Sequence, residues 1–79
     1  MNTQIDSILD RLGKHLPPVL PLTEFDKHPA LPRAKTVRNL RATRSIPSEL
    51  FVRDGRRVLV DVPAFLDWWG RRLRPEALH

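Results

Sequence analysis

Residues 51–60, FVRDGRRVLV, decide how the fold of this chain is interpreted. Two short apolar runs flank Asp54-Gly55, a preferred pair for the centre of a two-residue hairpin turn, because both central residues need positive φ. The stretch therefore predicts a β-hairpin with strands at residues 49–53 and 56–60. Three arginines crowd around the bend, where they repel one another and add nothing to a core: Arg53, Arg56 and Arg57.

Helices are predicted on both sides of this hairpin. In front of it, apolar residues at helical spacing indicate an N-terminal helix over residues 3–16, and a short helix is expected at residues 23–28. Leu31-Pro32 opens a further, basic helix, since proline suits the first helical turn. After the hairpin, Asp61 can cap a last helix that begins near Pro63.

The order of these elements predicts a mainly α fold with a small β-hairpin. A short helix, a turn and a basic helix make a candidate helix-turn-helix, and a hairpin directly after it would be a wing. We expect this winged helix-turn-helix domain to span residues 22–74. Residues 1–21 would form an amphipathic helix and a connector that its prolines keep extended, and residues 75–79 a C-terminal tail.

The size and composition of the chain exclude several classes of protein. Its 79 residues make one domain at most, and the absence of cysteine excludes a disulfide framework and a thiolate zinc site. No segment reaches the roughly 18 apolar residues of a membrane helix, and the N-terminus, which carries acidic residues and has no uninterrupted apolar run, is unlike a secretory signal. We expect a soluble, cytoplasmic protein without a cofactor.

The positive charge is concentrated in one part of the chain. The net charge is +5, but residues 33–57 alone hold eight basic and two acidic side chains, a net charge of +6, and the rest carries −1. Such asymmetry indicates a polyanionic partner, most simply nucleic acid. If this partner is double-stranded DNA, the bound protein would be associated with the nucleoid.

The basic helix has the composition of a helix that reads DNA. Ala34, Val37 and Leu40 form one narrow apolar stripe, and polar side chains occupy the other faces. A helix with small and polar side chains fits the major groove, where arginine and lysine suit guanine and asparagine suits adenine. The candidate DNA-binding residues of this helix are Arg33, Lys35, Thr36, Arg38, Asn39 and Arg41.

Among these residues, Lys35, Arg38 and Asn39 are the candidates for contacts with base edges. Arg33 would lie in the first turn, near exposed amides that favour a phosphate. The hairpin arginines would contact the neighbouring backbone or minor groove, where phosphates relieve their mutual repulsion. Arg56 lies at the bend and is the best candidate for the tip of the wing.

The sequence resembles a known family through TVRNL, the hairpin segment DGRRVLVDV and the segment PAFLDWW. It is similar to the excisionases, or recombination directionality factors, which are small winged helix-turn-helix proteins of phages and integrative elements, and to AlpA-like regulators. The resemblance covers residues 20–73 and implies a MerR/excisionase-like fold. One departure is the turn segment DKHPALPRAK, since the family commonly has small and hydroxyl residues there.

The resemblance implies a function as well as a fold. Members bind repeated attachment-site DNA cooperatively, bend it and direct an integrase, a tyrosine recombinase, toward excision of a mobile element; some regulate transcription. The family's DNA-contacting positions map onto Arg33 to Arg41 and onto Arg53, Arg56 and Arg57. Self-association on DNA would use apolar side chains, for which the candidates are Ile5, Ile8, Leu12 and Trp69.

Less specific roles for the same residues stay open. The charged hairpin could be an ordinary solvated turn, since edge charges discourage strand aggregation, and the basic helix could simply present a solvated face. The N-terminal helix could pack on its own domain instead of on a neighbour. Two further functions compete with excision: transcriptional regulation by the same fold, and a basic protein-binding module such as an antitoxin.

Catalytic and metal sites find no support in the sequence. The three histidines, His15, His28 and His79, lack the spacing with acids that a zinc site needs. Ser45 and Ser48 flank Pro47 as turn residues, with no base placed to activate them. We therefore expect a protein that binds DNA and is not an enzyme.

Overall fold

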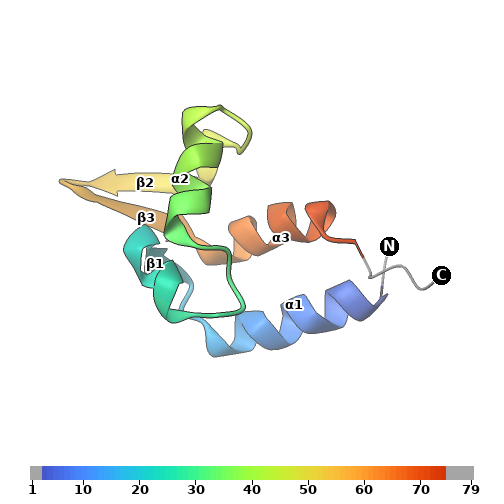
Figure 1. Cartoon of the computed structure of the whole chain (residues 1–79). Coiled ribbons are helices and arrows are strands. Elements are labelled where there is room, and N and C mark those ends of the chain that lie inside the picture. Colours follow the sequence, from blue (N-terminus) through green and yellow to red (C-terminus); the bar gives the residue numbers. More distant parts are fainter. Residues whose placement is uncertain (1–2, 75–79) are drawn as a thin grey trace.

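The computed structural model describes residues 3–74 and combines helices with a small antiparallel sheet, as the sequence predicts. The predicted tail, residues 75–79, lies outside the described residues. In Figure 1 the hairpin projects at one end of the molecule, and helices α1 and α3 lie side by side at the other. The elements are α1 (Thr3–His15), β1 (Val19–Pro21), the 3₁₀ helix η1 (Leu22–Lys27), α2 (Ala34–Ala42), the 3₁₀ helix η2 (Ser48–Leu50), β2 (Phe51–Asp54), β3 (Arg57–Asp61) and α3 (Val62–Arg72).

The sheet has three strands in the order β1-β3-β2, with both pairings antiparallel. Strand β1 lies inside the predicted proline-rich connector, and the sequence did not predict it. In this strand Leu20 pairs with Val60 and is buried. Pro21 is tolerated because β1 is an edge strand, where one missing backbone donor interrupts no central ladder. The connector thus contributes both backbone pairing and a core side chain.

The hairpin forms as predicted, but its turn is shifted by one residue. Asp54 pairs with Arg57, so the two central residues are Gly55 and Arg56, and the prediction of Asp54-Gly55 as the centre is wrong. Of these two only Gly55 has a positive φ, 60°, which fits the turn type with glycine at the first central position. Asp54 remains in the strand, where it is the register partner of Arg57, and its carboxylate pairs with the Arg57 guanidinium at 2.6 Å.

Helix α2 begins later than predicted because its cap comes from another element. Arg33 is the N-cap residue with extended backbone, so the helix starts at Ala34 and not at Pro32. The amide of Ala34 donates to a carboxylate oxygen of Asp26 in η1, at 3.0 Å. Asp26 therefore takes the role that a serine or aspartate at the N-cap usually has, and it fixes η1 against the start of α2.

Helix α3 begins as the sequence predicts. Asp61 is its N-cap, and its carboxylate accepts a hydrogen bond from the Ala64 amide at 3.3 Å. A proline stands in the first turn, where a missing amide costs no helical hydrogen bond. The last strand of the sheet thus leads directly into α3, and this junction fixes the helix relative to the hairpin.

One hydrophobic core joins all of these elements. At its centre Phe25 of η1 meets Phe65 of α3 edge to face, with ring centroids 5.1 Å apart, and each side chain is only 1% exposed. Phe65 also contacts Trp68 and Trp69, so the aromatic cluster is largely structural. The buried side chains of the core are Leu16, Leu20, Leu22, Phe25, Leu31, Ala34, Val37, Ile46, Leu50, Val60, Val62, Phe65 and Leu66.

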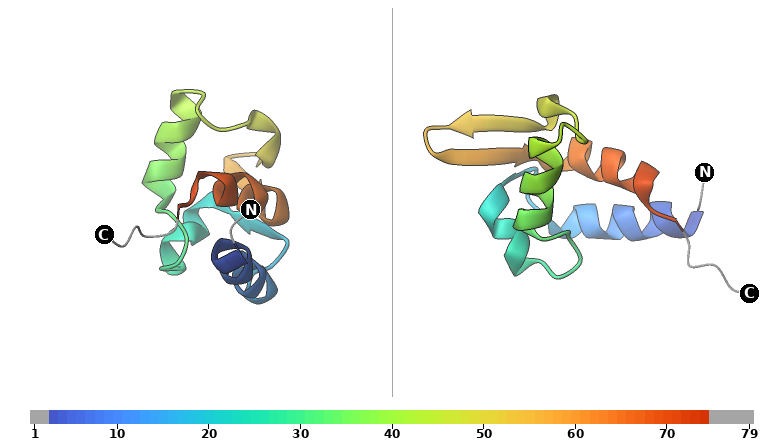
Figure 2. Two further views of the ribbon diagram at one scale, coloured as in Figure 1. Left: turned by 90° about the vertical axis from the view of Figure 1, so that its right-hand side faces the viewer. Right: turned by 45° about the horizontal axis from the view of Figure 1, so that its top comes forward.

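The N-terminal helix packs on its own chain. Leu9 and Leu12 of α1 lie against the core, and Ile5 is buried. A methyl group at Gly70 of α3 would collide with the Leu9 side chain, so the two helices approach closely at this glycine. Figure 2 shows α1 alongside α3 in both further views. Of the two placements that the sequence left open, the structure has the intramolecular one.

Candidate nucleic-acid interface

The outer face of α2 presents most of the residues that the sequence selected. The predicted apolar stripe is confirmed, since Ala34 and Val37 are fully buried and Leu40 packs against the core. This orientation turns the remaining side chains outward. Four of the predicted DNA-binding residues are exposed there: Lys35, Thr36, Arg38 and Asn39.

The basic residues of α2 and of the hairpin lie on the same side of the molecule. Helix α2 crosses the sheet near the base of the hairpin (Figure 1), and a shallow hollow of about 150 Å³ lies between them. Among the described residues that line this hollow, none is acidic. Its basic residues are Arg38 and Arg41 from α2, and Arg56 and Arg57 from the hairpin. We call these four residues the arginine cluster.

Two members of the arginine cluster already have partners within the chain. The guanidinium of Arg41 lies over the Phe51 ring, 4.8 Å from its centroid, which holds this side chain between α2 and β2. Arg57 pairs with Asp54, but both side chains are more than half exposed, and such pairs contribute little. Within residues 3–74, Arg38 and Arg56 make no ion pair, so their charges are available to a partner.

Arg53 also faces the side of the sheet on which α2 lies. It is two residues beyond Phe51 in β2, and alternate residues of a strand point to the same face. Its partner in the register is Val58, which lines the hollow. Of the three hairpin arginines, Arg56 and Arg57 line the hollow, and Arg53 lies on the face of the sheet that borders it.

The predicted phosphate site at the start of α2 is partly occupied by the protein itself. Arg33 is exposed at the N-cap position, as expected for a residue that contacts a ligand. However, the Ala34 amide donates to Asp26, whose carboxylate carries a negative charge to this helix end. That charge repels phosphate and offsets the attraction of the helix dipole. The sequence predicted that exposed amides at the start of α2 would favour a phosphate near Arg33. For the first of these amides, that of Ala34, this prediction is wrong.

A second hollow adjoins the first and contains a residue that was not selected from the sequence. It has a volume of about 550 Å³ and lies beyond the C-terminal end of α2. Its lining residues are Arg41, Arg44, Ile46 and Ser48. Because Arg41 lines both hollows, the basic surface continues past the helix as far as Arg44. Arg44 contributed to the predicted charge, but helical periodicity gave no reason to place it in the site.

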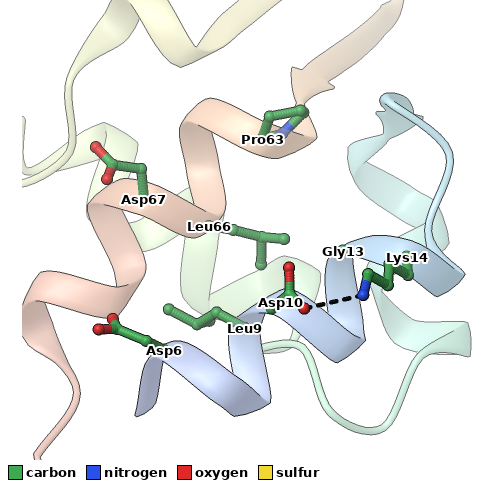
Figure 3. Close-up of a pocket in the computed structure, with 8 residues that line it drawn as sticks. All are labelled: Asp6, Leu9, Asp10, Gly13, Lys14, Pro63, Leu66 and Asp67. Carbon is green, nitrogen blue, oxygen red and sulfur yellow. Dashed lines mark ion pairs between the residues drawn. The ribbon is translucent and has the colours of Figure 1, made fainter. Parts of the chain in front are cut away.

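A third hollow lies away from this surface, between α1 and α3, and carries acidic side chains. Figure 3 shows Leu9 and Leu66 facing one another inside it, with Asp6, Asp10 and Asp67 around them. Its volume is about 400 Å³, and its one basic residue, Lys14, is paired with Asp10 at 3.1 Å. The acidic side chains that line this hollow therefore lie on α1 and α3, and none of them lines the hollow of the arginine cluster.

The four candidates for self-association differ in exposure. Ile5 is buried, Leu12 is partly covered by the core, and Trp69 stacks on Phe65 with a centroid distance of 6.1 Å. Ile8 is 45% exposed and is the most available of the four. An apolar contact between copies through α1 would therefore depend mainly on Ile8.

Metal and membrane sites are not found in the part of the chain that the structure describes. No three histidine, cysteine, aspartate or glutamate side chains of residues 3–74 lie close enough together to hold a metal ion. Over the same range, no helix combines the length and the apolar character that crossing a membrane requires. No protein-family model matches the sequence, and neither a curated protein nor a solved structure shows significant similarity to the chain.

Proposed function

We propose that this protein binds double-stranded DNA, with α2 in the major groove and the hairpin arginines on the adjacent backbone. One observation carries the proposal: Arg38 of α2 and Arg56 of the hairpin line the same hollow, and neither has an ion-pair partner within residues 3–74. Desolvated or crowded guanidinium groups are unfavourable unless anions surround them, and a duplex supplies phosphates on both sides of a groove.

Within this proposal the exposed residues of α2 divide into two roles. Lys35, Arg38 and Asn39 contact base edges, because their long or amide-bearing side chains reach into the groove and match guanine or adenine. Arg41 and the hairpin arginines contact phosphates, which position the protein without carrying sequence information. Thr36 takes a base or a phosphate through its hydroxyl group, and Arg33 contributes a charge at the edge of the interface.

The finer assignment rests on the order of elements and on the family resemblance. A short helix, a turn, a basic helix and a hairpin follow one another here as in a winged helix-turn-helix, in which η1 and α2 would be the two helices and β2–β3 the wing. On this basis we propose that the protein acts as an excisionase in the bacterial cytoplasm. It would line attachment-site repeats, bend the DNA and direct an integrase toward excision. Footprints on a promoter instead of an attachment site would indicate a transcriptional regulator.

The first experiment is a titration of the whole protein against a fluorescently labelled duplex of unrelated sequence, followed by anisotropy at several salt concentrations. We expect a dissociation constant of about 10⁻⁴ to 10⁻⁶ M at physiological salt and an affinity that falls steeply as salt rises, because counterions are released from the duplex. No binding to the duplex at low salt, together with a protein partner that stays bound after nuclease treatment, would favour the protein-binding module.

Asn39→Ala tests the base-reading role of α2. A preferred site is first selected from a random duplex pool with the wild-type protein. The variant is expected to lose about 1 to 3 kcal/mol of preference for that site, because a paired contact to one adenine is missing. Its affinity for the unrelated duplex should stay as in the wild type, and an unchanged preference would show that another residue reads the bases.

A further inference from the structure

Arg44 has an unusual backbone conformation for its residue type. Its φ is 57°, and it is the one non-glycine residue of positive φ among residues 3–74. In this left-handed region a Cβ atom lies too close to the neighbouring carbonyl, so glycine is the usual residue directly after a helix. An arginine here lowers the stability of the fold relative to glycine, which raises the question of what its side chain contributes.

The end of α2 does not require the Arg44 side chain. The last carbonyls of the helix accept backbone hydrogen bonds from Ser45 to Leu40 at 2.8 Å and from Arg44 to Arg41 at 3.1 Å. The Thr43 hydroxyl donates to the carbonyl of Asn39 at 3.1 Å. Glycine would make the same backbone bonds without strain. Within residues 3–74 the Arg44 guanidinium makes no ion pair, so its positive charge is not neutralised by that part of the chain.

The surroundings of Arg44 are suited to an anion. The hollow of about 550 Å³ beside it is lined by Arg41, Ser48 and the buried Ile46, and by no acidic residue of the described chain. Through Arg41 it continues into the hollow of the arginine cluster.

We propose that Arg44, together with Arg41 and the Ser48 hydroxyl, binds a backbone phosphate of the DNA beyond the C-terminal end of α2. This inference rests on the proposed function and extends the interface by one phosphate site. The basic surface then runs from the tip of the hairpin across α2 to the loop of residues 43–48. The strained backbone at Arg44 persists because glycine would restore stability at the expense of this contact.

Arg44→Gly relieves the backbone strain and removes the positive charge. The two effects are measured separately, the first as thermal stability and the second as affinity for DNA. We expect its melting temperature to rise by a few degrees, on the order of 4 °C, because the left-handed conformation no longer costs energy. Its affinity for the unrelated labelled duplex should fall about 10-fold, and the slope of log affinity against log salt should become shallower by about 0.9, the value for one phosphate contact.

Two further variants serve as controls. Arg44→Lys keeps the positive charge and the strained backbone, so we expect it to retain most of the affinity and the wild-type melting temperature. Arg11→Ala removes one charge from α1, where the Arg11 side chain bonds only the Ser7 carbonyl, and should leave the salt slope unchanged. Together they separate a local contact at residue 44 from a general effect of net charge.

The possible results distinguish this inference from the proposed function. If wild-type protein binds the duplex and Arg44→Gly has the wild-type slope, the phosphate site is wrong and the proposed function stands. If Arg44→Gly melts at a lower temperature, the side chain stabilises the helix end and the argument from strain is overturned. If the wild-type protein binds no duplex, the proposed function and this inference fail together.

Discussion

Replacing Arg38 and Arg56 together by alanine is expected to weaken binding to a duplex by at least about 100-fold, because two charge-assisted hydrogen bonds worth about 1.5 to 3 kcal/mol each are lost. The two side chains come from different elements but line one hollow, and neither is engaged in an ion pair within residues 3–74. Anisotropy titrations at increasing salt should show a slope that is shallower by about 0.9, because Arg56 contacts a phosphate and Arg38 contacts a base.

The matched control for this variant removes the same number of charges elsewhere. Arg11 and Arg71 lie on α1 and α3, and Arg71 forms an exposed pair with Asp67 at 2.7 Å. The double variant Arg11→Ala/Arg71→Ala has the same net charge as Arg38→Ala/Arg56→Ala but keeps the arginine cluster. It should therefore bind the duplex nearly as well as the wild type. Equal losses in the two double variants would mean that net charge, and not the arginine cluster, determines binding.

Phe65→Ala is expected to destabilise the fold by about 3 to 5 kcal/mol, as is usual when a buried aromatic side chain is removed from a core. Phe65 is 1% exposed and contacts Phe25, Trp68 and Trp69, so its ring joins η1 to α3. A core in a chain of this size rarely supplies more than about 3 to 5 kcal/mol, so the substitution should remove most or all of the stability of the fold. Circular dichroism and thermal melting measure this loss.

Two milder substitutions show whether the effect depends on burial. Phe65→Leu keeps most of the apolar volume, so it should lower the free energy of unfolding by less than Phe65→Ala does. Each kcal/mol lost should lower the melting temperature by about 4 to 8 °C. Ile8→Ala changes an apolar side chain that is 45% exposed, and it should change stability by no more than about 0.5 kcal/mol. If the Phe65→Ala protein had the same melting temperature as Ile8→Ala, the placement of Phe65 at the centre of the core would be contradicted.

The elements that depend on local sequence could be predicted. Alternating apolar residues and a glycine indicate the hairpin, Asp61 indicates the start of α3, and the spacing of Ala34, Val37 and Leu40 indicates which face of α2 is buried. The turn was misplaced by one residue because Asp54 belongs to the strand ladder opposite Arg57, and a dipeptide preference does not include cross-strand pairing.

The features that depend on distant residues could not be predicted in the same way. Strand β1 exists because Leu20 pairs with Val60, forty residues later in the chain, and a proline-rich segment gives no sign of this. The start of α2 is set by Asp26, eight residues before Ala34. Likewise, charge counting placed eight basic residues in one segment, but only the fold could bring Arg38 and Arg56 to the same hollow.

The central claim is that α2 and the hairpin contact one duplex from the same side of the protein. Its most direct test is a titration of ¹⁵N-labelled protein with duplex DNA, in which amide chemical shifts report the contacted residues. We expect the largest changes in α2, in the loop of residues 43–48 and at Gly55 and Arg56, with little change in α1. Changes confined to α1 and α3, with α2 and the hairpin unaffected, would contradict the claim.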